Sequence, residues 1–332
     1  MNTQEIFSIK NKKDFEKKAL EIFCFQAKNN LIYKSYIAQI EIKPEKIKSV
    51  EQIPFLPIEF FKTKDVVCQS SVVSRQSQVF LSSGTTGMER SKHLVSDISL
   101  YEKSFRKCFD IFYGDVKQYA ILALLPGYYE NKNSSLLYMA MDLIQRSENK
   151  FSSFYNGKDE NIIQVIEMLL KKKQKVFLLG VSFALLDLSE KLISLFRDDG
   201  SNLIVMETGG MKGRREEMTR EELHKILCEK FGVKKIHSEY GMTELLSQAY
   251  SKGDGIFKSP PWTKVFTRDV NDPFQLLPPE KTGALNIIDL ANIYSCSFIA
   301  TQDVGRIYRD GSFEVLGRMD NSDLRGCNLL AQ

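Results

Sequence analysis

The sequence has 332 residues, of which 43% are hydrophobic and 27% are charged, and its formal net charge is +4. This is the composition of an ordinary globular protein, and the charge is too small to indicate nucleic-acid binding. The length allows one large domain or two modest ones. No stretch approaches the roughly 20 apolar residues of a membrane span, and residues 1–5 show no apolar signal segment.

The first third of the chain predicts helices followed by an irregular segment. Charged and apolar residues alternate at helical spacing over residues 12–29, and a second apolar stretch covers 31–40. We expect both to form a helical lid that packs on the main body. Residues 53–62 are rich in aromatics and carry two prolines, which interrupt regular helix. This segment is expected to be buried, either as core packing or as a pocket wall.

The middle of the chain alternates helices with short apolar runs. Continuous apolar runs of this length are typical of strands buried on both faces of a parallel sheet. Thr219-Arg220-Glu221-Glu222 is a capping box that should start the last of the helices. The pattern predicts an α/β fold with mainly parallel sheets and flanking helices. Helices are expected at 96–112, capped by Ser96 or Asp97, and at 161–170, 183–195 and 219–231; strands are expected at 119–125, 176–180 and 203–207.

The pattern changes after Lys258, where prolines break up the alternation. Short β pieces follow at 284–290, 297–300, 306–308 and 313–316. Asp310-Gly311, between the last two, is a strong hairpin signal. We therefore expect two domains: an α/β core with an N-terminal helical segment over 1–257, and a β-rich subdomain with the C-terminal tail over 258–332.

The six cysteines lie far apart, and no two of them form a C-x-x-C pair. With three histidines beside them, no metal-binding cluster is legible. We expect a soluble, cytoplasmic protein with free thiols. Five cysteines stand in apolar patterns and are expected in the core: Cys24, Cys68, Cys108, Cys228 and Cys296.

A run of hydroxyls and glycines, Ser82-Ser83-Gly84-Thr85-Thr86-Gly87, is the most distinctive stretch. Residues 79–81 before it can end a buried strand. Glycines let such a loop bend so that successive N–H groups surround an anion such as phosphate. Arg90 and Lys92, just behind the loop, can add positive charge. The loop is not a Walker motif, because no Gly-Lys-Ser/Thr follows. By itself it could also be a solvated turn between a strand and a helix.

Further stretches, taken with this loop, resemble the adenylate-forming enzymes, the acyl- and aryl-CoA synthetase superfamily. The loop is similar to their phosphate loop, and Tyr240-Gly241-Met242-Thr243-Glu244 is similar to their Tyr-Gly-x-Thr-Glu motif. Asp303 and Arg318 stand in stretches that resemble the ribose-binding aspartate and the Gly-Arg-x-Asp hinge. Gly209-Gly210 resembles the turn that lies on adenine. The order and spacing agree over about residues 80–320.

The sequence is closer still to the acyl-protein synthetases, the fatty-acid-activating component of the bacterial luciferase system. The stretches 54–62, 101–105, 237–244 and 323–329 carry this resemblance. Aryl-CoA ligases of the phenylacetate type are the nearest competitors. Only residues 319–332 follow Arg318. The resemblance therefore implies the large domain of an adenylate-forming enzyme without the usual small C-terminal domain.

The resemblance implies that ATP and Mg²⁺ activate a carboxylic acid, in this family a fatty acid, to acyl-AMP. Glu244 would bind the magnesium ion and Asp303 the ribose, while Arg318 would reach ribose or phosphate. The residues assigned to the nucleotide are Ser82, Ser83, Gly84, Thr85, Thr86, Gly87, Gly209, Gly210, Tyr240, Gly241, Met242, Asp303 and Arg318. The residues assigned to catalysis are Cys327, Glu244, Thr243, Arg90 and Lys92.

Cys327 stands where acyl-protein synthetases carry the cysteine that accepts the acyl group. A thiolate is a strong nucleophile for an activated carbonyl, and Arg325 could lower the thiol pKa. The thioester would then pass to a reductase, an acyltransferase or a carrier protein. The alternative for Cys327 is an inert free thiol.

Two other classes of function remain open. A ligase could pass the acyl group to CoA, an amine or a carrier protein, and a non-catalytic binding protein could keep the nucleotide fold. The sequence leaves open the identity of the acid, whether the pathway is luminescent or biosynthetic, the oligomeric state and whether the C-terminal tail is complete.

Overall fold

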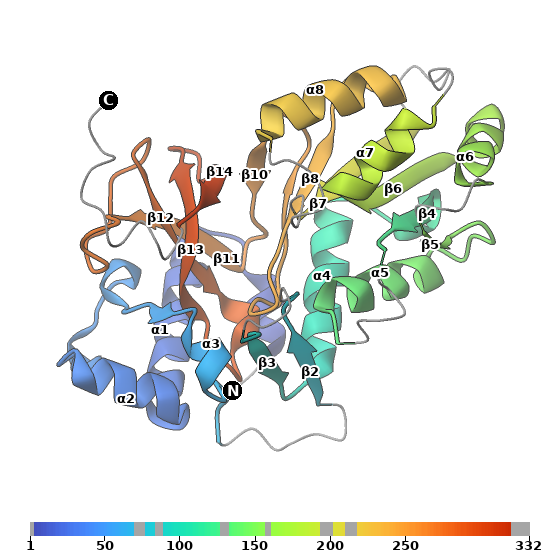
Figure 1. Ribbon diagram of the computed structural model, residues 1–332. Helices are drawn as coiled ribbons and strands as arrows, with labels where there is room; N and C mark the ends of the chain where they lie inside the picture. The colour runs from blue at the N-terminus through green and yellow to red at the C-terminus, as the bar shows by residue number, and fades with distance from the viewer. Residues whose placement is uncertain are drawn as a thin grey trace. The chain divides into compact units, whose positions relative to one another are not determined.

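The structure, a computed structural model, describes residues 3–69, 77–83, 89–126, 133–156, 161–192, 202–209 and 218–319 (Figure 1). By its internal contacts the chain divides into two compact units. Unit 1 comprises 1–104, 244–247 and 258–332, and unit 2 comprises 105–243 and 248–257. The chain enters unit 1 for the last time at Lys258. The division into domains at 1–257 and 258–332 stays a prediction.

Unit 2 is built on a parallel sheet, as the apolar runs predicted. Its parallel strands lie in the order β8, β7, β6, β4, β5, and β9 pairs with β8 in the antiparallel direction. All residues of β4 are buried, which explains why its sequence is a continuous apolar run. The strands are β4 (Tyr119–Leu124), β5 (Ser153–Tyr155), β6 (Lys175–Val181), β7 (Leu203–Thr208), β8 (His237–Tyr240), β9 (Ala249–Ser251) and β10 (Ile256–Lys258).

Helix α8 of unit 2 begins where the sequence places its cap. The Thr219 backbone N–H donates to Glu222 Oε2 at 2.9 Å, and the Glu222 N–H donates to Thr219 Oγ1 at 3.2 Å, so the predicted capping box is confirmed. Helices α7 and α8 lie side by side (Figure 1). The helical elements are η4 (Val116–Gln118), α5 (Ser135–Arg146), α6 (Asn161–Lys171), α7 (Ser182–Glu190) and α8 (Arg220–Phe231). Helix α5 and strands β5, β8, β9 and β10 were not predicted.

Helix α4 (Ile98–Tyr113) begins in unit 1 and ends in unit 2. Asp97 Oδ1 accepts a hydrogen bond from the Ser99 backbone N–H at 3.0 Å, which confirms one of the two predicted caps. The helix buries Phe105, Cys108 and Phe109, whose spacing places them on one apolar face.

Unit 1 contains the β-rich part of the chain. Four antiparallel strands lie in the order β11 (Thr263–Arg268), β12 (Thr282–Asp289), β13 (Phe298–Ile307) and β14 (Phe313–Arg318). The short strand β1 (Leu56–Pro57) pairs with β13 in the parallel direction. The predicted hairpin between β13 and β14 is confirmed, since Gly311 has a φ of +83° and Tyr308 N–H donates to Ser312 O at 2.8 Å. Strand β11 was not predicted.

Strand β13 corrects the prediction of two separate pieces at 297–300 and 306–308. Its ten residues run continuously and pass a register shift between Val304 and Gly305. Gly305 permits this, because a Cβ at that position would lie 2.2 Å from the Glu314 carbonyl oxygen of the neighbouring strand. The two pieces are therefore one strand whose interior is interrupted by an irregularity rather than by a turn.

The helical elements of unit 1 pack on this sheet. The rings of Phe23 and Tyr33 lie 6.1 Å from that of Phe298, so the two predicted N-terminal helices cover strand β13. The proline-containing segment is largely core, since Phe61 is fully buried. The elements are η1 (Thr3–Ser8), α1 (Lys12–Asn29), α2 (Leu31–Gln39), η2 (Pro44–Lys46), η3 (Val50–Gln52), α3 (Phe60–Thr63) and η5 (Leu290–Asn292).

The hydroxyl-and-glycine loop joins β2 (Gln78–Leu81) to β3 (Lys92–Val95), which pair in the antiparallel direction. The expectation of a buried strand before the loop is wrong in part, because Phe80 is buried but Val79 is 38% exposed. The alternative of a turn between a strand and a helix is also wrong, since a second strand follows. Throughout the described ranges, no helix has the length and apolar character that crossing a membrane requires.

Candidate active site

The base of the hydroxyl-and-glycine loop is closed by its own hydrogen bonds. Ser82 N–H donates to Ser91 O at 3.0 Å, and Ser91 N–H donates to Ser82 Oγ at 2.9 Å. Arg90 Nε donates to Ser82 O at 2.6 Å, so the arginine is held against the backbone that enters the loop. Ser83 is exposed. Gly84, Thr85, Thr86 and Gly87 lie outside the described residues, and phosphate binding by the loop stays a prediction.

Glu244 is a buried carboxylate of unit 1, with only 5% of its surface exposed. Burial raises its pKa, and the negative charge of Asp303 acts in the same direction. A hydrogen bond from the Ser91 side chain and the positive charge of Arg318 oppose that rise. The structure thus brings Glu244, Asp303 and Arg318, which the sequence places far apart, into one electrostatic environment within unit 1.

Asp303 and Arg318 occupy opposite positions on strands β13 and β14. Asp303 is half-buried, and its backbone N–H donates to Thr301 Oγ1 at 3.1 Å. Arg318 is exposed and donates from Nη2 to Gln302 Oε1 at 3.2 Å. Gln302 Nε2 in turn donates to Glu59 Oε1 at 2.6 Å. The arginine is therefore tied through Gln302 to the proline-containing segment.

The other predicted cation, Lys92, forms an ion pair with Asp65 at 2.5 Å. Both side chains are largely exposed, at 41% and 60%. An exposed pair of this kind contributes little to stability. The catalytic role of Lys92 stays a prediction.

The oxygen groups around Glu244 suit a magnesium ion that arrives with a nucleotide. Among the residues that the structure describes, no group of three or more His, Cys, Asp or Glu could hold a metal by itself. Magnesium is usually held by one or two carboxylates and by substrate phosphates rather than by a protein cage. A buried carboxylate next to the charge of Asp303 gains from a divalent cation, because the cation offsets both desolvation and repulsion. The donor set is compatible with Mg²⁺ bound together with a nucleotide, and the assignment of Glu244 as its protein ligand stays a prediction.

Segment 244–247 is anchored by two residues that the sequence analysis missed. Asp289 Oδ2 accepts from Leu246 N–H at 2.8 Å, and Asn292 Nδ2 donates to Glu244 O at 2.7 Å. Both anchors are buried. No local motif indicates them, because each contact joins residues more than 40 positions apart.

The remaining predicted residues of the Tyr-Gly-x-Thr-Glu motif belong to unit 2. Tyr240 ends β8 and is half-buried, and its ring lies 5.9 Å from that of Phe257. A Cβ at Gly241 would lie 2.5 Å from Glu239 Oε1, so a side chain at this position would require the Glu239 carboxylate to move. Met242 and Thr243 are half-buried.

Gly209, the first residue of the turn assigned to adenine, has a φ of +68°, which favours glycine. Its carbonyl accepts a hydrogen bond from Ser182 Oγ at 2.8 Å. Gly210 lies outside the described residues.

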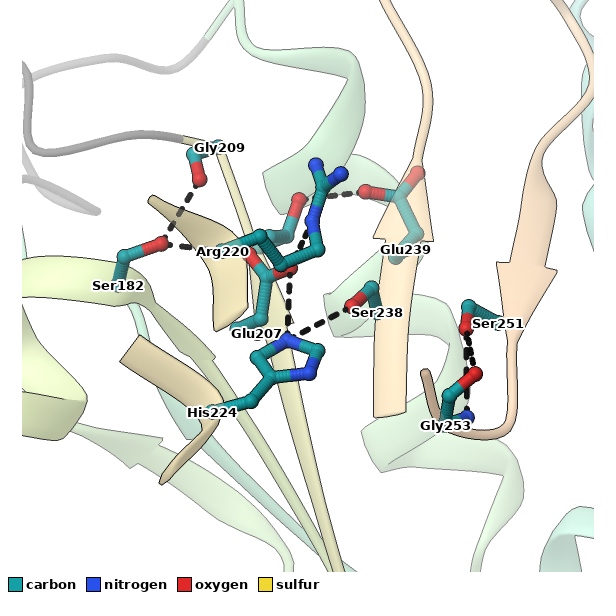
Figure 2. A network of polar contacts seen from close by, with 10 residues as sticks. Ser182, Glu207, Gly209, Arg220, His224, Ser238, Glu239, Ser251 and Gly253 are labelled. Carbon is teal, nitrogen blue, oxygen red and sulfur yellow. Dashed lines mark hydrogen bonds and ion pairs between the residues drawn. The ribbon is translucent and has the colours of Figure 1, made fainter. Parts of the chain in front are cut away.

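A polar network, also missed from the sequence, lies at the carboxyl ends of β7 and β8 in unit 2 (Figure 2). Glu207 lies 3.3 Å from Arg220 Nε and 3.5 Å from His224 Nε2. Burial opposes ionisation of Glu207, but the His224 hydrogen bond and the charge of Arg220 outweigh it and lower the pKa. We therefore treat Glu207 as ionised.

Glu239, on the neighbouring strand, behaves in the opposite way. It is buried and accepts a hydrogen bond from Thr208 Oγ1 (Figure 2). Burial raises its pKa to about 7, the charge of Glu207 adds to the rise, and the Thr208 hydrogen bond opposes it. Two glutamates on adjacent strands thus have opposite pKa shifts, because the charge of Arg220 and the hydrogen bond with His224 favour the ionised form of Glu207.

Three of the five described cysteines are poor candidates for an acyl acceptor because they are buried. Cys68, Cys108 and Cys296 are buried as expected, and burial raises the pKa of Cys68 to about 12. The core prediction is wrong for Cys24, which is exposed, and Cys228 is half-buried. Cys327 lies outside the described residues, so its assignment stays a prediction.

Comparisons with known proteins place this geometry in a family. Residues 5–332 match the model of the family described as acyl-protein synthetase, LuxE. The search of curated proteins finds no match. Among solved structures, 2-hydroxyisobutyryl-CoA ligase in an open conformation with 2-HIB-AMP and CoA is 13% identical, with a TM-score of 0.61 over 93% of this chain and 70% of that chain.

Two further structures share the fold. ATP-bound MatB from Rhodopseudomonas palustris is 18% identical, with a TM-score of 0.51 over 72% of this chain and 47% of that chain. The luciferase-like enzyme from the nonluminescent mealworm Zophobas morio is 17% identical, with a TM-score of 0.51 over 75% and 59%. At these identities the likeness shows the fold alone, and the matched region spans about half the length of the MatB chain.

The structural comparison confirms the predicted α/β fold of the adenylate-forming enzymes, with its mainly parallel core. The family model extends over nearly the whole sequence. The chain therefore belongs to the LuxE acyl-protein synthetase family.

Proposed function

We propose that the protein uses ATP to activate a carboxylic acid, with a fatty acid as the substrate class, and transfers the acyl group to its own Cys327. In the first step a carboxylate oxygen bonds to the α-phosphorus of ATP and pyrophosphate leaves, which gives acyl-AMP. In the second step the Cys327 thiolate bonds to the acyl carbon and AMP leaves, while the thiol proton passes to solvent. Family membership supports this sequence of reactions.

The observation that supports adenylation most is the environment of Glu244. The attacking carboxylate and the triphosphate are both anions, so the site must neutralise charge before they meet. A buried carboxylate that is hydrogen-bonded by Ser91 and lies in the field of Arg318 is suited to hold a nucleotide-bound cation in one place. Mg²⁺, when bound, would withdraw charge from the phosphate oxygens. Groups placed before charge develops reduce the barrier most effectively.

The nucleotide is proposed to contact residues of the five stretches that resemble family motifs. Residues 82–87 would bind the β- and γ-phosphates through N–H and hydroxyl groups, with Arg90 and Lys92 adding charge. Asp303 would accept hydrogen bonds from the ribose hydroxyls, and Arg318 would contact ribose or phosphate. In unit 2, the Tyr240 ring, the backbone of 241–243 and the Gly209-Gly210 turn would contact adenine.

Cys327 is proposed as the acceptor because a thiolate is a strong nucleophile for an acyl-adenylate. The chain from Arg318 to Cys327 can span roughly 30 Å when extended, which is ample reach from a ribose to an acyl carbonyl. The resulting thioester would deliver the acyl group to a reductase, an acyltransferase or a carrier protein. A reactive thiol of this kind requires a reducing compartment, in keeping with a cytoplasmic enzyme.

The acceptor is tested by labelling. The protein is incubated with ATP, Mg²⁺ and radiolabelled tetradecanoic acid, and the bound label is challenged with hydroxylamine, which cleaves thioesters. We expect Cys327→Ser to abolish the hydroxylamine-labile label and to retain ATP–pyrophosphate exchange. Cys24→Ser, which removes an exposed thiol, is the matched control and should label like the unaltered protein. Unchanged labelling of Cys327→Ser would reject the acceptor.

A CoA ligase is the second candidate. It is favoured by the similarity over 93% of this chain to a ligase solved with an acyl-adenylate and CoA. This alternative predicts acyl-CoA formation by Cys327→Ser when CoA is added, with no label on the protein. ATP–pyrophosphate exchange over a panel of carboxylic acids would identify the substrate in either case, and no exchange with any acid would favour a binding protein.

A further inference from the structure

The segment Glu244–Ser247 has an unusual place in the chain. By its contacts it belongs to unit 1, although Thr243 before it and Gln248 after it belong to unit 2. Such a short segment cannot hold a position through its own secondary structure. The contacts that fix it therefore decide where the Glu244 carboxylate lies.

Asp289 fixes the second half of the segment. Its carboxylate is fully buried and accepts from Leu246 N–H at 2.8 Å and from Ser247 Oγ at 2.7 Å. The same carboxylate accepts from Ala291 N–H at 3.1 Å, which ties it to η5. The segment is thus bonded through both a backbone and a side-chain group.

Asn292 fixes the first half and uses both ends of its amide. Nδ2 donates to Glu244 O at 2.7 Å and to Cys296 O at 2.9 Å. Oδ1 lies 3.0 Å from Nε2 of His93, which is fully buried on β3. The backbone of Glu244 is therefore linked through Asn292 to the strand that leaves the phosphate loop.

The side chain of Glu244 is also held next to strand β3. Its carboxylate is hydrogen-bonded by Ser91, the residue immediately before β3. The backbone and the carboxylate of Glu244 are thus both held relative to β3, one through Asn292 and His93, and the other through Ser91. This arrangement keeps the carboxylate in a constant position relative to the base of the loop.

We propose that Asn292 is a positioning residue that sets the Glu244 carboxylate for the magnesium ion of Mg·ATP, which rests on the proposed function. Magnesium demands near-octahedral geometry at short ligand distances, so a small shift of the carboxylate weakens binding. Without the Asn292 amide, the buried Glu244 carbonyl loses its donor and the segment must move to find another. Loss of such outer partners typically lowers metal affinity by about 10- to 100-fold.

The test uses Asn292→Leu, which keeps the size of the side chain and removes both ends of the amide without adding charge. Equilibrium dialysis measures the affinity of the full-length protein for labelled ATP, once with Mg²⁺ and once in EDTA. We expect affinity in Mg²⁺ to fall by about 10-fold or more, while affinity in EDTA stays within about twofold. Asn30→Leu is the matched control, because Asn30 is also fully buried and donates to a unit 1 carbonyl, Ser295 O, at 2.9 Å. It should leave the ratio of the two affinities unchanged.

Equal losses with and without Mg²⁺, or no loss, would overturn the proposal. Should Asn292→Leu not fold, Asp289→Asn carries the same test, because it is isosteric and removes a charge that burial disfavours. It should show the same selective loss in Mg²⁺, and an unchanged ratio would reject the positioning role. Failure of the unaltered protein to bind Mg·ATP would instead reject the proposed function itself.

Discussion

Asp303 and Arg318 face each other directly across strands β13 and β14. The sequence resemblance assigns Asp303 to the ribose and Arg318 to the hinge, and the antiparallel register places them on the same rung of the sheet. Their charges act in opposite directions on the pKa of Glu244. A single strand pair thus carries two of the groups on which the proposed adenylation depends.

The first prediction concerns Glu244. Glu244→Gln keeps the size of the side chain and an oxygen that can accept from Ser91, but it removes the negative charge that would bind magnesium. We expect acid-dependent ATP–pyrophosphate exchange to fall by about 100-fold or more, the usual scale for losing one electrostatic group of an active site. Glu16→Gln, at an exposed ion pair with Lys12, is the control and should exchange normally. Full activity of Glu244→Gln would remove Glu244 from the mechanism.

The second prediction concerns the network around Glu207. Replacing Glu207 by Leu leaves His224 and Arg220 without the carboxylate that lies 3.5 Å and 3.3 Å away. Because Arg220 is 31% exposed and can turn towards water, we expect a loss of about 2 kcal/mol in the free energy of unfolding, less than for a fully buried pair. Urea denaturation would measure it. Glu16→Gln should change stability by less than about 1 kcal/mol, and equal effects of the two substitutions would contradict the prediction.

The third prediction is a pH dependence of stability caused by Glu239. Its pKa in the folded protein is about 7, whereas an exposed glutamate titrates near roughly 4.3. Between these two values the folded state binds more protons than the unfolded state, so stability falls as pH rises. The contribution of this group to unfolding free energy should decrease by about 3 kcal/mol from pH 4 to pH 8.

Glu239→Gln removes this titration. Urea denaturation of both proteins across the pH range would give two stability curves, and the difference between them should grow in favour of the variant as pH rises. The pKa of Glu207 is lowered, so its contribution to stability changes with pH in the opposite direction. Glu207 is present in both proteins, and its contribution therefore largely cancels in the comparison. Parallel curves would show that Glu239 is not held neutral.

The fourth prediction compares two glycines of one hairpin. A Cβ at Gly305 would lie 2.2 Å from a backbone oxygen of the neighbouring strand, whereas a Cβ at Gly317 meets nothing within 4 Å. We expect Gly305→Ala to lower the unfolding free energy by about 2 kcal/mol or more, since the strand pair must separate to admit the methyl group. Gly317→Ala should be neutral within about 0.5 kcal/mol. Thermal denaturation of both variants would check the contrast, which similar melting temperatures would refute.

Local patterns predicted the elements that depend on local physics. The strands β4, β6 and β7 could be predicted from apolar runs, because buried parallel strands need apolar side chains on both faces. The start of helix α8 could be predicted from Thr219 and Glu222, since a capping box pairs free backbone N–H groups at the start of a helix within four residues. Helix α5 was overlooked.

The proposed site could be predicted only in part from the sequence. Glu244, Asp303 and Arg318 were selected by their resemblance to family motifs, and the structure brings them together in unit 1. Asn292 and Asp289 match no motif, and asparagine and aspartate in isolation most often mark turns or caps. Their importance appears only when their partners 42 to 48 positions away are known.

The sequence alone determined most of the helices, the buried strands β4, β6 and β7 with the parallel character of their sheet, and the family to which the chain is similar. These follow from side-chain periodicity and from short motifs, in which neighbours along the chain are also neighbours in space. Only the tertiary structure decided that the loop closes a β2–β3 hairpin, that the pKa of Glu207 is lowered while that of Glu239 is raised, and that Asn292 donates a hydrogen bond to the backbone of Glu244. These depend on burial and on hydrogen bonds between distant segments, whose strength is set by the low-dielectric interior that forms when the chain folds.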